Sequence, residues 1–419
     1  MTPKILTTMK TYDRETLRAD VLAGITVAMV ALPLSLAIAV ASGAGPEKGL
    51  VTAIVGGFLI SLLGGSRVQI GGPTGAFIVV VYGVIAEHGY DGLVLATLMG
   101  GLILLIAGAL KAGRLIRLVP EPVINGFTIG IAVIIATSQL KDLLGLDADV
   151  PAEFFAKLGA LWQARDAVSG AALGAGLAAM VLIVALRRAF PKLPGLIVAV
   201  ALVSAVVAVA DLPVDTIRSR FGDLPRSLPL PAVPEVTLAR LAELLPSALI
   251  IAFLAGVESL LSAMVADRMS GGHHRPNAEL LAQGAANVGS ALFGGLPATG
   301  AIARTATNVR AGGRTPVAGL VHAVTILVVM LVAAPLAGYM AMPALAGLLI
   351  LTAWNMSEPH RWASYLKERR SDQVLLVLTF VLTVVADLTV AIGTGVALGL
   401  ALRLARRQVP DADWEPRDR

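Results

Sequence analysis

Two similar turns decide the fold: Gly72-Pro73-Thr74-Gly75-Ala76 in the first half of the chain and Pro297-Ala298-Thr299-Gly300-Ala301 in the second. Each turn follows a pair of glycines, at 64–65 and at 294–295, and each leads into a helical segment too short to cross a bilayer alone. Short segments interrupted by glycine or proline, at corresponding positions of two halves, are typical of the binding site of a secondary transporter. The pair therefore predicts a membrane protein that moves a small solute.

The composition of the surrounding chain is that of a polytopic membrane protein. Of its 419 residues, 56% are hydrophobic and 15% are charged, and long apolar runs such as 21–40 and 93–110 recur. This exceeds the apolar content of soluble domains, and a helix needs roughly 20 apolar residues to span the hydrocarbon core. The first run follows a charged leader at 4–20 and is too long for a cleaved signal peptide, so we expect a retained first span.

The sequence also excludes several kinds of site. Cysteine is absent, which excludes disulfides and thiolate metal sites. The five histidines show no metal-ligand spacing, and no phosphate-binding loop supports direct coupling to ATP. The net charge of +5 is expected in cytoplasmic loops rather than at a nucleic-acid interface. Without a nucleophile–base pair, we expect no enzymatic activity, no cofactor and no nucleic-acid partner.

The hydropathy pattern predicts an all-α polytopic membrane protein with fourteen transmembrane segments. The tenth segment carries several polar residues and would be missed on hydropathy alone. We include it because it corresponds to the third segment in the other half. The predicted segments are 20–41, 50–64, 73–87, 92–111, 121–140, 167–187, 194–210, 244–267, 279–294, 300–310, 316–338, 342–354, 374–389 and 391–406.

Lysine and arginine indicate the orientation of these segments. Basic residues gather at 4–18, 268–275, 310–314 and 367–370, which are inward-facing when the amino terminus is cytoplasmic. The 211–240 loop breaks this pattern, but long translocated loops are less bound by it. We therefore expect a multi-pass protein of the cell inner (plasma) membrane, with the tails 1–19 and 408–419 both cytoplasmic.

Seven segments in each half predict an inverted repeat, because an odd number makes the second half enter from the opposite side. The first repeat covers 20–236 and the second covers 237–407. Landmarks recur in the same order, for example Pro33-Leu34-Ser35-Leu36 against Gly256-Val257-Glu258-Ser259-Leu260. Segments 3 and 10 are then half-helices, which are tolerated only where protein or a wet cavity surrounds them.

The starts of these two half-helices are candidates for an anion site. Free amides and the positive end of a helix dipole attract negative charge there. Glycine and alanine allow a ligand close to the backbone. The alternative interpretation is tight helix packing through small residues. The candidate substrate-binding residues are Pro73, Thr74, Gly75 and Ala76 in the first turn and Thr299, Gly300 and Ala301 in the second.

Two ionisable residues within the segments are functional candidates, because charges are costly inside a bilayer. Glu258 has apolar flanks and is expected near the middle of the eighth segment. Burial disfavours a charged carboxylate, so Glu258 is the candidate proton-coupling residue. The alternative is a structural carboxylate that is hydrogen-bonded to a neighbouring helix or paired with Arg304. Arg304 lies one helical turn beyond Gly300 and is the candidate cation for the substrate, with snorkelling to the surface as the alternative.

The sequence resembles the sulfate permease (SulP) family of anion transporters and exchangers. The resemblance rests on 64–67 with 72–77, on Glu258-Ser259-Leu260-Leu261-Ser262-Ala263 and on Ala303-Arg304-Thr305, and extends from about 11 to 407. It implies the fold of uracil and anion-exchanger proteins, with segments 1–4 and 8–11 as a substrate-carrying core and segments 5–7 and 12–14 as a gate. It also implies a homodimer. Members commonly carry a cytoplasmic STAS domain after the last segment, which we do not expect here, since the chain ends at Arg419.

The resemblance completes the candidate pocket. It implies a basic residue near the anion at the position of Arg304, with the remaining wall from Leu32, Pro33, Ser35, Phe77 and Ile302. A packing role for Leu32 and Phe77 is the alternative. Glu258 and Ser262 share a helix face and, with carbonyls near Gly300, are an alternative sodium site, since sodium-coupled bicarbonate uptake occurs in the family.

The leading hypothesis is a secondary-active transporter of small anions of the sulfate, bicarbonate and dicarboxylate class, driven by protons and embedded in membrane lipid. The alternatives are a sodium-coupled bicarbonate symporter and a passive anion channel. A nucleobase carrier of the same fold ranks lower, because that substrate is commonly held by paired carboxylates and the tenth segment offers Arg304 instead.

Overall fold

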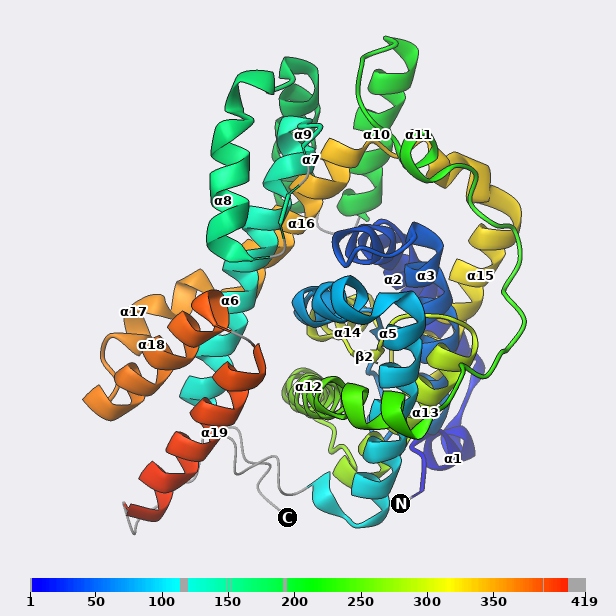
Figure 1. Cartoon of the computed structure of the whole chain (residues 1–419). Coiled ribbons are helices and arrows are strands. Elements are labelled where there is room, and N and C mark those ends of the chain that lie inside the picture. The colour runs from blue at the N-terminus through cyan, green and yellow to red at the C-terminus, as the bar shows by residue number, and fades with distance from the viewer. Residues whose placement is uncertain are drawn as a thin grey trace.

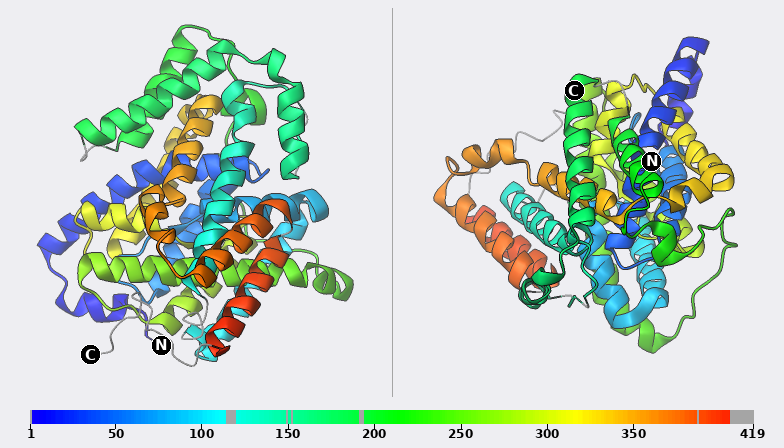
Figure 2. Two further views of the ribbon diagram at one scale, coloured as in Figure 1. Left: turned by 90° about the vertical axis from the view of Figure 1, so that its left-hand side faces the viewer. Right: turned by 90° about the horizontal axis from the view of Figure 1, so that it is seen from above.

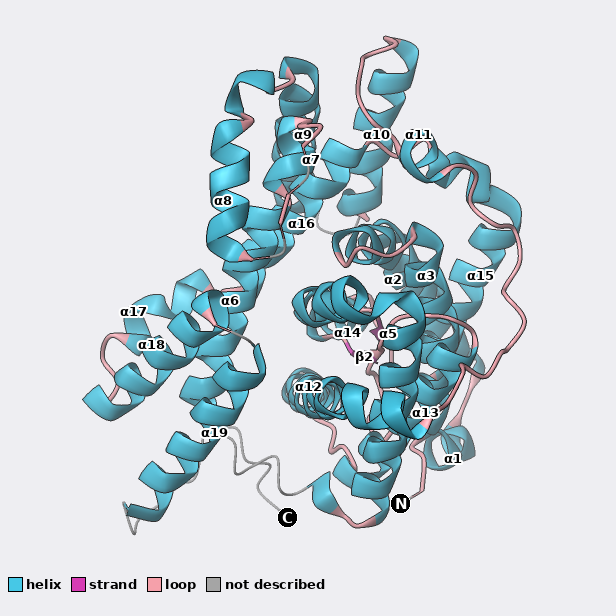
Figure 3. Cartoon of the chain, in the orientation of Figure 1, coloured by secondary structure: helices cyan, strands magenta, loops and turns pink. Residues whose placement is uncertain are grey.

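A computed structural model describes residues 2–113, 120–148, 150–151, 153–190, 194–386 and 388–405. These residues form a helical protein with one very short pair of strands (Figures 1 and 3). The predicted tail at 408–419 lies outside the described residues.

The first half contains eleven described α-helices and one strand. A short 3₁₀ or π-helical stretch adjoins several of them. The elements are α1 (Ile5–Thr8), η1 (Met9–Thr11), α2 (Arg14–Ala41), α3 (Pro46–Val51), η2 (Thr52–Gly56), α4 (Gly57–Leu63), β1 (Gly71–Gly72), η3 (Gly75–Phe77), α5 (Ile78–Ala109), α6 (Glu121–Ser138), α7 (Leu140–Leu144), α8 (Phe154–Gln163), η5 (Arg165–Ala167), α9 (Gly170–Ala189), α10 (Gly195–Val209) and α11 (Ile217–Phe221).

The second half contains eight described α-helices and the second strand. The elements are α12 (Leu238–Ser270), α13 (Pro276–Leu292), β2 (Thr299–Gly300), α14 (Ile302–Arg310), α15 (Val317–Gly338), α16 (Met342–Met356), η6 (Pro359–Arg361), α17 (Trp362–Tyr365), α18 (Arg370–Val385) and α19 (Leu388–Ala405).

Local sequence explains where the long helices begin and end. Asp13 caps α2 by accepting a hydrogen bond from the amide of Thr16 at 2.8 Å, and Thr237 caps α12 in the same way. Gly271 ends α12 in the left-handed conformation, which favours glycine. The third and fourth predicted segments run on as one helix, α5, interrupted at Gly89, whose φ of 69° is not helical.

Each predicted segment overlaps a described helix, and seven helical stretches are long and apolar enough to cross a membrane within the described ranges. They are Arg14–Ala41, Pro46–Leu63, Gly75–Ala109, Glu121–Leu144, Gly170–Ala189, Leu238–Ser270 and Val317–Gly338. Large apolar side chains are exposed along these stretches, such as Val332 (76%) and Leu336 (72%) on α15, which suits contact with lipid.

The helices pack in two groups, which Figures 1 and 2 show from three directions. In the first group α5 packs against α12 and α13, and α2 packs against α15. In the second group α6 packs against α16 and α18, and α9 packs against α16. We call them the α2/α12 group and the α6/α16 group. Contacts of α2 with α10 and α16 join them.

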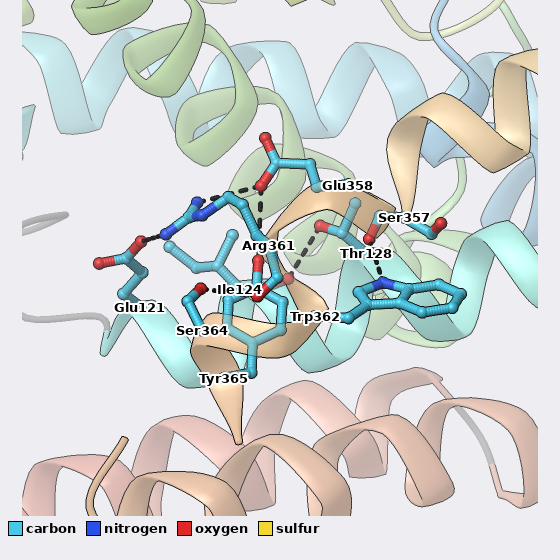
Figure 4. A network of polar contacts seen from close by, with 9 residues as sticks. All are labelled: Glu121, Ile124, Thr128, Ser357, Glu358, Arg361, Trp362, Ser364 and Tyr365. Carbon is cyan, nitrogen blue, oxygen red and sulfur yellow. Dashed lines mark hydrogen bonds and ion pairs between the residues drawn. The ribbon is translucent and has the colours of Figure 1, made fainter. Parts of the chain in front are cut away.

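A polar network joins the turn after α16 to the start of α6 (Figure 4). Arg361 donates to Glu121 at 2.7 Å and to Glu358 at 3.0 Å, and the indole nitrogen of Trp362 donates to the carbonyl of Ser357 at 2.7 Å. Both charged partners of Arg361 are partly exposed, so their stabilising effect is modest. The network holds two helices of the α6/α16 group in a fixed register.

The two strands correct the prediction of a purely α-helical chain. β1 pairs with β2 in an antiparallel sense, with Gly71 opposite Gly300 and Gly72 opposite Thr299. The tenth segment therefore begins as a strand and becomes helical only at Ile302, two residues later than predicted. In Figure 3 the strands lie within the α2/α12 group, surrounded by helices.

Candidate functional site

The pairing of β1 with β2, which we call the crossing, brings the two turns of the sequence side by side. Beyond the paired residues, the amide of Ala301 donates to the carbonyl of Ile70 at 2.8 Å. Each strand then leads into a helix, which starts at Gly75 after β1 and at Ile302 after β2. The two helix starts are 227 residues apart in sequence and flank the same short strand pair.

Both helix starts retain unpaired main-chain donors. Within the described residues, the amides of Gly75 and Ala76 donate to no oxygen atom, and neither do those of Ile302 and Ala303. The first amides of any helix have no partner in the helix itself. Because both helix starts flank the crossing, four donors and the positive ends of two helix dipoles border it.

Arg304 extends from α14 across the crossing. Its side chain is 1% exposed, and Nη2 donates to the carbonyl of Pro73 at 2.7 Å and lies 3.4 Å from the hydroxyl of Ser35. No carboxylate of the described residues lies within ion-pair distance of this guanidinium. A buried cation without a counter-charge is costly, and it favours a bound anion.

Glu258 contacts the other helix start. Its Oε2 atom accepts a hydrogen bond of 2.7 Å from the hydroxyl of Thr74, the residue before Gly75. Glu258 does not pair with Arg304, whereas its hydrogen bond with Thr74 fits the other form of the alternative, a carboxylate bonded to a neighbouring segment. The charge of Glu258 on α12 therefore acts directly beside the start of the third segment.

Part of this region is exposed. Glu258 and Thr74 are partly exposed, and Ile302 is 42% exposed although its neighbours Ala301 and Arg304 are buried. The α6/α16 group approaches the same place. A β-carbon added at Gly75 would lie 3.0 Å from Sδ of Met356 and 3.5 Å from Cδ1 of Ile135.

The apolar candidates lie deeper. Leu32, Ala76 and Phe77 are at most 3% exposed and pack in the main hydrophobic core, which favours a role in shaping the site over direct contact. Pro73 is also buried, and its carbonyl is taken by Arg304. Thr299 donates its hydroxyl to the carbonyl of Ala255 at 2.9 Å, so this side chain anchors the crossing to α12.

In the structure, two residues of the alternative sodium site, Ser262 and Glu258, have different partners. The hydroxyl of Ser262 lies 3.1 Å from that of Thr305 and is fully buried, whereas Glu258 contacts Thr74. Among the described residues, no group of three or more histidine, aspartate or glutamate side chains could hold a metal ion.

Gly300 is required by the packing of the crossing. A β-carbon at this position would overlap the side-chain amide of Gln69. That amide donates to Ser259 Oγ at 2.9 Å. The absence of a side chain at Gly300 therefore lets the crossing lie directly on α12.

Glu279, a buried carboxylate that the sequence did not single out, holds residues next to the crossing. Glu279 on α13 is fully buried and accepts hydrogen bonds from the amide of Gly65 at 2.8 Å, from Ser259 Oγ at 2.8 Å and from Gln283 at 2.8 Å. One turn further, Asn287 binds both the amide and the carbonyl of Ala298. Polar residues at 279, 283 and 287 recur every four positions of one helix face, which is the signal that could have revealed them.

Comparison with known proteins identifies relatives over most of the chain. The profile of the sulfate permease family matches residues 17–379. The Bacillus subtilis protein YvdB, a sulfate transporter by provisional assignment, is 44% identical over 379 residues, which are 90% of this chain and 71% of YvdB. The bicarbonate transporter BicA of Picosynechococcus is 33% identical over 342 residues, which are 79% of this chain and 60% of BicA. Both relatives extend beyond the part that the chain matches.

A solved structure shares the fold. The transmembrane domain of a cyanobacterial bicarbonate transporter, BicA, superposes with a TM-score of 0.82 at 31% identity, covering 93% of this chain and 98% of that domain. The resemblance seen in the sequence is thereby confirmed, and the chain has the helical membrane fold of this transporter.

Proposed function

The chain belongs to the sulfate permease family, a family of membrane transporters, and on this premise we propose that it is a secondary-active transporter of small anions that binds its substrate between the starts of the third segment and of α14. One observation carries the proposal: unpaired amides of two helix starts flank the crossing, and a buried guanidinium without a carboxylate partner among the described side chains lies across it. An anion satisfies the amides and the charge together.

The substrate class follows from this chemistry and from the relatives. Main-chain amides and a guanidinium recognise negative charge and oxyanion shape rather than a particular side group. Relatives carry names that assign them sulfate or bicarbonate transport. We therefore propose sulfate, bicarbonate or a dicarboxylate as the substrate.

We propose protons as the driving ion, acting through Glu258. A charged carboxylate next to Thr74 repels an anion at the start of the third segment, and a protonated one does not. Proton and anion are then bound together and released together, which is symport. Sodium remains the alternative, although Ser262 contacts Thr305 rather than Glu258.

The proposed mechanism is alternating access, in which the α2/α12 group moves as the core against the α6/α16 group as the gate. The proposed topology is fourteen segments in a seven-plus-seven inverted repeat. The packing partners support it, because they occur in pairs that the repeat exchanges. The contact of α2 with α15 corresponds to that of α12 with α5, and the contact of α6 with α18 corresponds to that of α16 with α9. We further propose a homodimer in the inner membrane with both termini cytoplasmic.

Uptake into proteoliposomes tests the proposed function. The purified chain should take up at least one of radiolabelled sulfate, bicarbonate, chloride and fumarate with saturable kinetics, and an inward proton gradient should accelerate it. Acceleration by a sodium gradient alone would support the symporter alternative. Unitary current steps in planar bilayers, with flux that does not saturate, would identify a channel and contradict the proposal.

A further inference from the structure

A histidine near the start of α15 has no partner for its polar atoms among the described residues. His322 lies in the second turn of the helix and is fully buried, and neither ring nitrogen forms a hydrogen bond with any described residue. Its ring lies close to the crossing. A β-carbon added at Gly57 would lie 3.8 Å from Cε1 of His322 and 2.9 Å from the carbonyl oxygen of Gly71 in β1.

The unpaired side of the Arg304 guanidinium lies at Gly72, the residue after Gly71 in β1. Its Nη2 atom is bound by Pro73, but Nε and Nη1 have no partner in the described part of the chain. Nη1 lies directly against Gly72, because a β-carbon there would overlap it. The two unpaired groups thus lie near adjacent residues of β1.

A third residue with an unpaired polar atom lies near them. The hydroxyl of Ser61 on α4 is buried and has no partner among described residues, and a β-carbon at Gly319 would overlap it. Gly319 precedes His322 by one turn of α15. Five buried polar atoms without partners, from Ser61, Arg304 and His322, are therefore gathered where α4, α15 and the crossing meet.

Such a cluster is costly when dry. A buried polar group without a partner costs free energy, and proteins commonly supply the missing partner as ordered water bound by two to four polar groups. On the described helices packed against α15, the carboxylates of Asp20 and Glu47 are already engaged: Asp20 accepts from Arg314 and Thr315, and Glu47 pairs with Lys48.

We propose that ordered water links His322 and Ser61 to the unpaired Nε and Nη1 atoms of Arg304. His322 is thereby a positioning residue for Arg304, the cation of the proposed anion site. A neutral imidazole both donates and accepts, so it can hold a water that accepts from the guanidinium. The Pro73 carbonyl fixes one edge of Arg304 and the water fixes the other. This inference rests on the proposed anion site, because it assigns a support to the arginine of that site.

Two substitutions in the full chain distinguish positioning from packing. His322→Phe keeps the ring volume but removes the polar atoms, and should raise the KM of uptake about tenfold with Vmax within about twofold, since one hydrogen-bonded link to a charged group is lost. His322→Gln keeps a donor and an acceptor and should keep KM within about twofold. The probe is whichever of radiolabelled sulfate, bicarbonate, chloride and fumarate the unmodified chain takes up. Ile326→Ala, one turn along α15 and equally buried, should lower Tm and leave KM unchanged.

A packing role predicts the reverse order, with phenylalanine tolerated at least as well as glutamine, and that order would overturn the inference. If His322→Phe does not fold, Ser61→Ala replaces it, and an unchanged KM would count against the shared water. A map at about 2 Å resolution without ordered water at Nε or Nη1 of Arg304 would also overturn it. Full uptake by Arg304→Ala, in contrast, would remove the proposed anion site itself.

Discussion

Arg304→Ala is expected to reduce anion uptake about a hundredfold, whereas Arg304→Lys should retain about a tenth of the activity of the unmodified chain. Arg304 is the one described cation that reaches the crossing, and its charge has no carboxylate partner there. Lysine keeps a positive charge but loses the planar fork that binds the Pro73 carbonyl and an oxyanion at the same time. Initial uptake rates at equal protein in the membrane measure the effect.

The control for this pair is Arg310→Ala. Arg310 is exposed at the end of the same helix, α14, so its removal should leave uptake within about twofold of the unmodified rate. Equal activity of Arg304→Ala and Arg304→Lys would contradict the role of Arg304 in oxyanion recognition. Loss of uptake in all three variants would point instead to the net charge of α14.

Glu258→Gln is expected to abolish the dependence of uptake on the driving gradient. Glutamine has the shape of a protonated glutamate and cannot ionise, so the start of the third segment stays neutral whatever the pH. Its side-chain oxygen can still accept the hydrogen bond from Thr74, so the fold should be retained. Anion exchange driven by the anion's own gradient should continue, while accumulation driven by a proton gradient should cease.

The matched control is Glu243→Gln on the same helix. Glu243 is largely exposed and lies 3.1 Å from His88, away from the crossing, and its variant should still accumulate anion. Proton-driven accumulation by Glu258→Gln at the unmodified rate would exclude Glu258 as the coupling residue. If a sodium gradient drives uptake, the same variant should lose that dependence instead.

The features that were predicted from sequence are those fixed by local chemistry. Glycine and proline at 72–76 and 297–301 interrupt the helices whatever surrounds them, and the apolar runs define the helices on both sides. The family could be recognised because its motifs lie in and beside the first turn, around Glu258 and just after the second turn. Arg304 and Glu258 could be identified because an ionisable residue in an apolar segment is rare.

The features that were missed depend on contacts between distant parts of the chain. The crossing joins Gly71 to Gly300, and no local pattern of two residues indicates a strand. Glu258 contacts Thr74 rather than Arg304, a choice made by how α12 packs on the third segment. Glu279 and His322 looked like ordinary members of their helices, because their significance lies in partners at Gly65 and near Gly72.

The most direct measurement is the location of a bound anion. Selenate, which matches sulfate in charge and shape and scatters anomalously, should be soaked into crystals of the full chain. The account predicts an anomalous peak within hydrogen-bond distance of the amides of Gly75 or Ala76 and of Ile302 or Ala303, next to Arg304, and no such peak in Arg304→Ala. A peak at any other place, with the space between the two helix starts empty while selenate is transported, would contradict it.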